Sequence, residues 1–174
     1  MLRLQLEGGV TVTAATASYL DNLITRALTN TENFTGRNAG EFFEKVAGAA
    51  STDFEAIDDI IDEGNGKKSI VSLGRKSSRP DWSDNTYIEK VEKELRSKGK
   101  RINNNRTIPP RNGRNPEQTL QSSTIKNRVM VVALPEERLH LATDPRMRRM
   151  LLRLQGQLRN VKMVVAPLRN WRSR

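Results

Sequence analysis

The stretch RVMVVAL, residues 128–134, is a nearly continuous apolar run after its first residue, and Pro135 ends it. Strands with one solvated face alternate apolar and polar residues, whereas strands covered on both faces have apolar runs of this kind. The stretch therefore predicts a central strand of a sheet, with other elements packed on both of its faces.

The residues after this strand predict a helix and a second strand. Thr143 or Asp144 can cap the helix, and Pro145 suits its first turn. The apolar face of the helix consists of Met147, Met150, Leu151, Leu154 and Leu158. Gly156 weakens this helix by about 1 kcal/mol relative to alanine. A close packing contact that leaves no room for a Cβ would explain a glycine at this position. Residues 161–166 form the next apolar run.

The N-terminal residues predict a β-hairpin followed by a helix. Residues 2–6 and 10–13 each alternate apolar and polar side chains, and Gly8-Gly9 between them supplies a turn. Thr16 or Ser18 can cap the helix, whose apolar face consists of Tyr19, Leu20, Leu23, Ile24, Ala27 and Leu28.

Two further helices are expected, over residues 41–50 and after residue 53. The second has an apolar face of Phe54, Ile57, Ile60 and Ile61 and an acidic outer face with Glu55, Asp58, Asp59, Asp62 and Glu63. A solvated face is the simplest interpretation. The alternative is a docking face for basic residues of a neighbour, formed by Asp58, Asp59, Asp62 and Glu63. A divalent-metal site at Asp58 and Asp62 lacks further ligands.

A turn, a strand and a helix should follow the acidic face. The sequence GNGKKS, residues 64–69, resembles the end of a phosphate-binding P-loop but has Ile61 in place of the first glycine, so it predicts a turn. Residues 70–73 predict a strand, and a helix capped by Ser83 or Asp84 should end near Ser97. Its inner face consists of Tyr87, Ile88, Val91 and Leu95.

Residues 97–116 carry six cations and no acid, with five Asn, two Gly and three Pro. Such a composition cannot build a core, so we expect a long, extended basic arm over residues 98–127. Its phosphate-binding or protein-docking residues are Lys98, Lys100, Arg101, Arg106, Arg111 and Arg114. A second basic ridge is expected on the last helix, formed by Arg146, Arg149 and Arg153.

The chain has a formal net charge of +10, which is unevenly distributed. Residues 1–66 contain four Lys/Arg and eleven Asp/Glu, for a net charge of −7, and residues 67–174 contain twenty-six and nine, for +17. This asymmetry suggests a polyanionic partner for the second half. It also suggests a head-to-tail contact between copies, with the acidic face meeting the arm or the ridge.

The residue types available argue against catalysis. The chain has no Cys and one His, so thiol catalysis, thiolate zinc sites and Ser/His systems have little to build on. His140 lies between two leucines, and we expect it to have a structural role. We therefore expect no enzyme, cofactor, metal or small-molecule substrate. No apolar stretch is long enough for a signal peptide or a membrane span.

Together these features predict an α+β protein with a small mixed sheet. Residues 1–97 would form the hairpin and helices of a single domain, residues 128–167 its strand–helix–strand unit, and residues 168–174 a basic tail. A small α+β core with an arm over residues 98–116 and an Arg-rich tail is similar to the head-tail connector, neck and tail-completion proteins of tailed bacteriophages. No single motif carries this similarity.

That resemblance implies a structural protein of the virion, assembled in the host cytoplasm. It would form a ring of identical copies, contact other structural proteins and approach DNA without reading its sequence. The alternative is a ribosomal or other RNA-binding assembly protein in a cytoplasmic ribonucleoprotein, which the net charge of −7 in the first half disfavours. An independent DNA-binding regulator is a third possibility, but no recognition motif is present.

Overall fold

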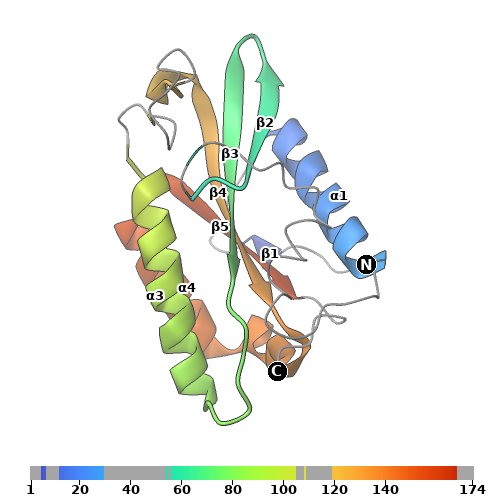
Figure 1. The fold of residues 1–174 in the computed structure, drawn as a ribbon, viewed down its shortest axis with the longest axis vertical. Helices are drawn as coiled ribbons and strands as arrows, with labels where there is room; N and C mark the ends of the chain where they lie inside the picture. Colours follow the sequence, from blue (N-terminus) through green and yellow to red (C-terminus); the bar gives the residue numbers. More distant parts are fainter. Residues whose placement is uncertain are drawn as a thin grey trace.

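The computed structural model describes residues 5–6, 12–29, 54, 56–104, 108 and 119–167. They form a five-stranded mixed sheet in the order β1-β5-β4-β3-β2, with helices on both faces (Figure 1). This is the α+β class that the sequence predicts. The elements are β1 Gln5–Leu6, α1 Ala14–Thr29, β2 Asp59–Gly64, β3 Lys67–Arg75, α3 Asp84–Ile102, η3 Ser122–Thr124, β4 Ile125–Leu134, η4 Glu136–Thr143, α4 Pro145–Gln157 and β5 Val161–Pro167.

The predicted central strand is confirmed as β4, which pairs in parallel with β3 on one side and β5 on the other. All its residues from Asn127 to Leu134 are buried. Successive side chains of a strand point to opposite faces. Met130, Val132 and Leu134 accordingly pack in one core, and Val129, Val131 and Ala133 pack in another.

The connections between the parallel strands place α3 and α4 together. α3 joins β3 to β4, and α4 joins β4 to β5, so both connections step across the sheet in the same direction. Crossovers of one hand that step in one direction lie on one face of the sheet. α3 and α4 form this helical layer, and α1 covers the opposite face with Leu20 and Leu23 (Figure 1).

The N-terminal hairpin is not present in the described residues. β1 pairs antiparallel with β5, with Gln5 opposite Val165, and Val12 and Thr13 lie in the coil that leads into α1. The remaining residues of the predicted hairpin lie outside the described residues, as do those of the helix predicted over residues 41–50. The helix predicted at Tyr19 is confirmed as α1 and begins earlier, at Ala14.

The helix predicted after residue 53 is wrong, because Asp59–Gly64 is strand β2 and pairs antiparallel with β3. Gly64, Asn65 and Gly66 all have positive φ, of 81°, 54° and 73°. An Asn-Gly pair in this conformation closes a tight hairpin. The predicted turn is therefore confirmed, and it turns the chain between two strands. Alternation along β2 places Ile60 and Ile61 in different cores.

The helix predicted to end near Ser97 continues to Ile102, so residues 98–102, which were predicted to belong to the extended arm, are helical. Gly99 is buried against Leu158, and a Cβ on Gly99 would clash with Cδ1 of Leu158. Ile102 is also buried, and these two contacts hold the last turn of α3 on the helical layer. The close contact expected at Gly156 is absent, since a Cβ there meets nothing within 4 Å.

Candidate polyanion-binding surface

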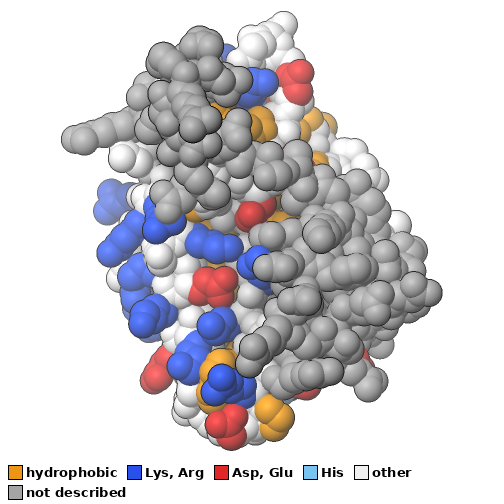
Figure 2. Space-filling model, in the orientation of Figure 1, with side chains coloured by type: hydrophobic (Ala, Val, Ile, Leu, Met, Phe, Trp, Pro, Cys, Tyr) orange, Lys and Arg blue, Asp and Glu red, His pale blue; other side chains and the backbone are white. Residues whose placement is uncertain are grey.

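Lys and Arg side chains gather over the helical layer (Figure 2). We name the exposed ones on α3, on α4 and in the turn after α4 the cationic surface; they are Lys90, Lys93, Lys100, Arg101, Arg148, Arg149, Arg153 and Arg159. The sequence from Pro145 to Val161 contains no acid. Charges that are far apart in the sequence thus share one face, because both crossovers lie on it.

The predicted ridge of three arginines does not form one free row. Arg146 donates to Asn85 Oδ1 at 3.0 Å and pairs with Asp144, and Arg153 donates to Glu92 Oε1 at 3.0 Å. Both arginines thus face the side of α4 that packs on α3. Arg149 is exposed and makes no ion pair with a described residue. Two of the three arginines therefore help to join the helices, and one remains available.

The predicted arm residues also separate into two groups. Lys98, Lys100 and Arg101 lie in the last turns of α3. The negative end of the helix dipole stabilises positive charges there. Lys98 is engaged, since its Nζ donates to Leu73 O at 2.8 Å. Lys100 and Arg101 are exposed and belong to the cationic surface. Arg106, Arg111 and Arg114 lie outside the described residues.

The four acids of the predicted docking face do not share a face, because they lie in or beside a strand. Asp58 accepts the backbone N–H of Leu73 at 2.6 Å, and Asp62 is exposed at the hairpin turn. Glu63 is half-buried under α1. The predicted helical acidic face is therefore wrong, although each residue could still contact a partner singly.

Glu63 belongs to a polar cluster that the sequence does not reveal. Its Oε1 accepts hydroxyl hydrogen bonds from Thr13 at 2.7 Å, Thr16 at 2.8 Å and Ser69. Asn127 Nδ2 donates to Thr13, Thr16 and Ser69 hydroxyls. Burial raises the pKa of Glu63, but these hydrogen bonds outweigh it and the net shift lowers the pKa. The cluster fixes the N-terminus of α1 on the sheet.

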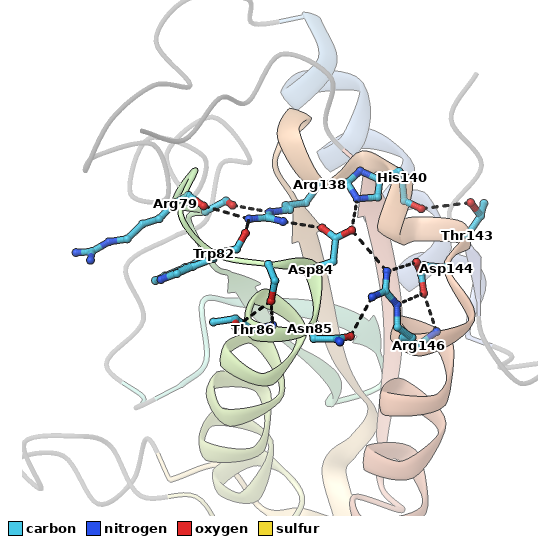
Figure 3. A network of polar contacts seen from close by, with 12 residues as sticks. Arg79, Trp82, Asp84, Asn85, Thr86, Arg138, His140, Thr143, Asp144 and Arg146 are labelled. Atoms are coloured by element: carbon cyan, nitrogen blue, oxygen red, sulfur yellow. Dashed lines mark hydrogen bonds and ion pairs between the residues drawn. The ribbon is translucent and has the colours of Figure 1, made fainter.

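A second network lies where β3 and β4 end and α3 and α4 begin (Figure 3). Arg138 is 7% exposed and donates to Asp84 Oδ1 and to Ser78 Oγ, both at 2.6 Å. It also donates to the carbonyls of Arg79 and Trp82, at 3.1 and 2.7 Å. Arg138 thereby holds the loop between β3 and α3.

The only histidine belongs to the same network. His140 Nε2 lies 2.9 Å from Asp84 Oδ2, and Arg146 lies 3.5 Å from the same oxygen. Burial raises the pKa of Asp84, but the hydrogen bonds from His140 and Arg138 lower it by more than burial raises it, so the net shift is downward. No local sequence pattern marks Arg138, because its side-chain partners lie more than fifty residues away.

The described residues form neither a candidate metal site nor a membrane-spanning helix. Within them, no three or more His, Asp or Glu side chains gather in a way that could hold a metal ion. No helix in the described part of the chain is long and apolar enough to cross a membrane.

The fold and the surface define a small α+β protein with a strongly cationic helical layer. A scan against protein-family models, a search of curated proteins and a search of solved structures each found no match to this chain.

Proposed function

We propose that this protein is a non-enzymatic structural component of a large nucleic-acid-containing assembly. The particular role that we propose is a neck or tail-completion protein of a tailed-phage virion, which forms a ring with its own copies. The cationic surface on the helical layer supports this proposal. Arg and Lys side chains on a rigid surface bind phosphates without reading base sequence.

The His140–Asp84 pair favours a structural role over a catalytic one. General acid–base catalysis needs a side chain that can exchange a proton with a reacting group. The Asp84 carboxylate is instead occupied by His140, Arg138 and Arg146. Arg138 is committed to backbone and side-chain acceptors of the loop before α3. We therefore attribute the network to loop positioning.

Self-assembly would use two different surfaces of the chain. β2 lies at the edge of the described sheet and carries Asp59 and Asp62, which an adjacent copy could reach. The cationic surface lies on a different part of the molecule and would be its counterpart. Exposed ion pairs contribute only about 0–1 kcal/mol each, so charge would set the orientation of the copies while apolar contacts supply the affinity.

The test is the salt dependence of binding to a DNA duplex. Replacing Arg149 and Arg159 by Gln removes two exposed cations from the cationic surface. The slope of log K against log salt should fall by roughly 0.9 for each lost phosphate contact. The matched control replaces Lys68 on β3 and Lys126 on β4 by Gln; neither lysine belongs to the cationic surface, so the slope should stay nearly unchanged.

Native mass spectrometry of the chain with and without DNA gives the copy number of any ring. Equal slopes for the two double variants, or no binding by the wild-type chain, would contradict a role for the cationic surface. Tighter binding to an RNA duplex than to DNA would favour the ribonucleoprotein alternative.

A further inference from the structure

A groove of about 540 Å³ opens between the C-terminal ends of α3 and α4. Both helices end on the same side of the helical layer, because both return from the carboxyl ends of parallel strands (Figure 1). Leu158 lies in the groove, and its polar lining residues are Arg96, Lys100, Asn103, Asn104, Gln157 and Asn160. None of the residues that line it is acidic.

Internal hydrogen bonds fix the orientation of two carboxamides in this groove. Asn103 Oδ1 accepts the backbone N–H of Asn160 at 2.9 Å, and only an oxygen can accept there. Gln157 Oε1 accepts hydrogen bonds from the Nε–H and a terminal N–H of Arg96, both at 3.4 Å. Because a guanidinium only donates, the Gln157 atom that faces it must be the oxygen. The two amide oxygens are therefore used within the protein, and the two NH₂ groups remain to donate to a ligand.

The two cationic side chains of the groove, Lys100 and Arg96, are donors as well. Lys100 is exposed and contributes three N–H donors. Arg96 donates to Glu92 and Gln157 through two of its nitrogens, which leaves its third nitrogen for a ligand. Glu92 adds little repulsion, because Arg153 and Arg96 both pair with it. A groove with donors from two cations and two amides suits an anion that only accepts.

The partial negative charge at the two helix ends opposes an anion, but side chains donate to three carbonyls at or just after these ends. Arg128 donates to Asn104 O at 3.2 Å, and Asn160 Nδ2 donates to Asn103 O at 2.9 Å. Gln155 Nε2 donates to Leu158 O at 3.3 Å. Arg128 is only 7% exposed, so it adds a buried positive charge beside the groove. These donors reduce the negative potential of three carbonyls that would otherwise favour a cation.

We propose that the groove between the ends of α3 and α4 binds one phosphate group, and we call this binding site the phosphate seat. This inference rests on the proposed function, within which the ligand is a backbone phosphate of nucleic acid. Inorganic phosphate has the same acceptor oxygens and is the alternative ligand for this groove. A phosphate held at one fixed position would give the cationic surface a defined register on a nucleic-acid backbone.

The decisive variant is Gln157→Glu, which keeps an oxygen for Arg96 and replaces the donating NH₂ by a second carboxylate oxygen. Its matched control is Asn85→Asp at the opposite end of α3, where Asn85 Oδ1 likewise accepts from an arginine, Arg146. Lys100→Gln in the groove is paired with Lys93→Gln, another exposed lysine of α3 outside it. Urea unfolding shows whether each variant remains folded.

Two titrations of the full chain separate the proposals. With a short DNA duplex, both groove variants should lose about tenfold more affinity than their controls, because a good charge-assisted contact is worth about 1.5–3 kcal/mol. With inorganic phosphate, the side-chain NH₂ signals of Asn103 and Gln157 should shift in NMR spectra of the wild-type chain, and chloride should not reproduce the shift. In the Gln157→Glu variant, phosphate should no longer shift the NH₂ signal of Asn103.

The outcomes distinguish the groove from the surface as a whole. If groove and control variants lose equal affinity for DNA, binding is spread over the cationic surface and the phosphate seat is wrong, while the proposed function stands. If DNA does not bind but phosphate shifts the two NH₂ signals, the seat is supported and the proposed function fails. If neither probe affects these residues, the seat is wrong.

Discussion

Arg138 should be one of the most important polar side chains for the stability of this fold, which Arg138→Met tests. The guanidinium is 7% exposed and makes four hydrogen bonds, to Ser78, Asp84 and two loop carbonyls. It also lies 5.1 Å from the ring centre of Tyr87. Methionine keeps much of the apolar stem but leaves every one of these acceptors without its donor.

The magnitude follows from the environment of each acceptor. Hydrogen bonds to a charged group contribute about 1.5–3 kcal/mol each, and they are not additive. Removing one partner of a buried ion pair costs about 3–5 kcal/mol. The side chain of Asp84 is 27% exposed and keeps His140 and Arg146, so the loss should lie at the lower end of that range. We expect about 3 kcal/mol.

Urea unfolding of the wild-type, Arg138→Met and Arg138→Lys chains measures this loss as a lower midpoint at an unchanged m-value. Lysine keeps the charge but cannot reach all the acceptors, so its loss should be intermediate. Hydrogen exchange should show lower protection in the loop from Lys76 to Ser83. A loss below about 0.5 kcal/mol, typical of a surface substitution, would refute the assignment of this loop anchor.

Two further predictions concern helix glycines and acid stability. Gly156→Ala should stabilise the fold by about 1 kcal/mol, because its Cβ meets nothing within 4 Å, whereas Gly99→Ala should destabilise it through the clash with Leu158; equal effects in urea unfolding would contradict this. The pKa of Glu63 is lowered, so its ionised form stabilises the fold at pH values above the ordinary glutamate pKa of 4.5. This stabilisation is lost as the pH falls below 4.5. Glu63→Gln should be less stable at neutral pH and lose less stability in acid, and parallel pH profiles of the urea midpoint would argue against this.

The sequence predicted best the elements whose burial follows from one local pattern. The apolar runs of β4 and β5 and the spaced apolar residues of α4 needed no information from distant residues. β2 was predicted as a helix because Phe54, Ile57, Ile60 and Ile61 also fit helical spacing. In this hairpin strand with a core on each face, Ile61 is buried in one core and Ile60 packs partly buried against the other, so strict alternation of apolar and polar residues is lost.

The candidate site was predicted less well, because its residues are positioned by distant partners. The composition of residues 98–102 suggests an extended arm, yet the contact between Gly99 and Leu158 keeps this segment helical. The ridge prediction found arginines on one arc of α4 but could not reveal that Glu92 and Asp144 engage two of them. The sequence did not mark Arg96 and Gln157 as site residues, because their roles depend on a contact between two distant positions of the chain.

The topology explains why this chain can concentrate cations without destabilising its core. Both crossovers lie on one face of the sheet, so α3 and α4 share a solvent boundary and their outer faces add to one surface. Glu92 of α3 lies near this surface and joins the two helices, since it pairs with Arg153 of α4 as well as with Arg96 of α3. The cations of the cationic surface remain exposed, where charge repulsion is screened by water and salt. A polyanion that follows this surface would release counterions and relieve that repulsion, which makes the placement of charge, more than any single residue, the basis of the proposed function.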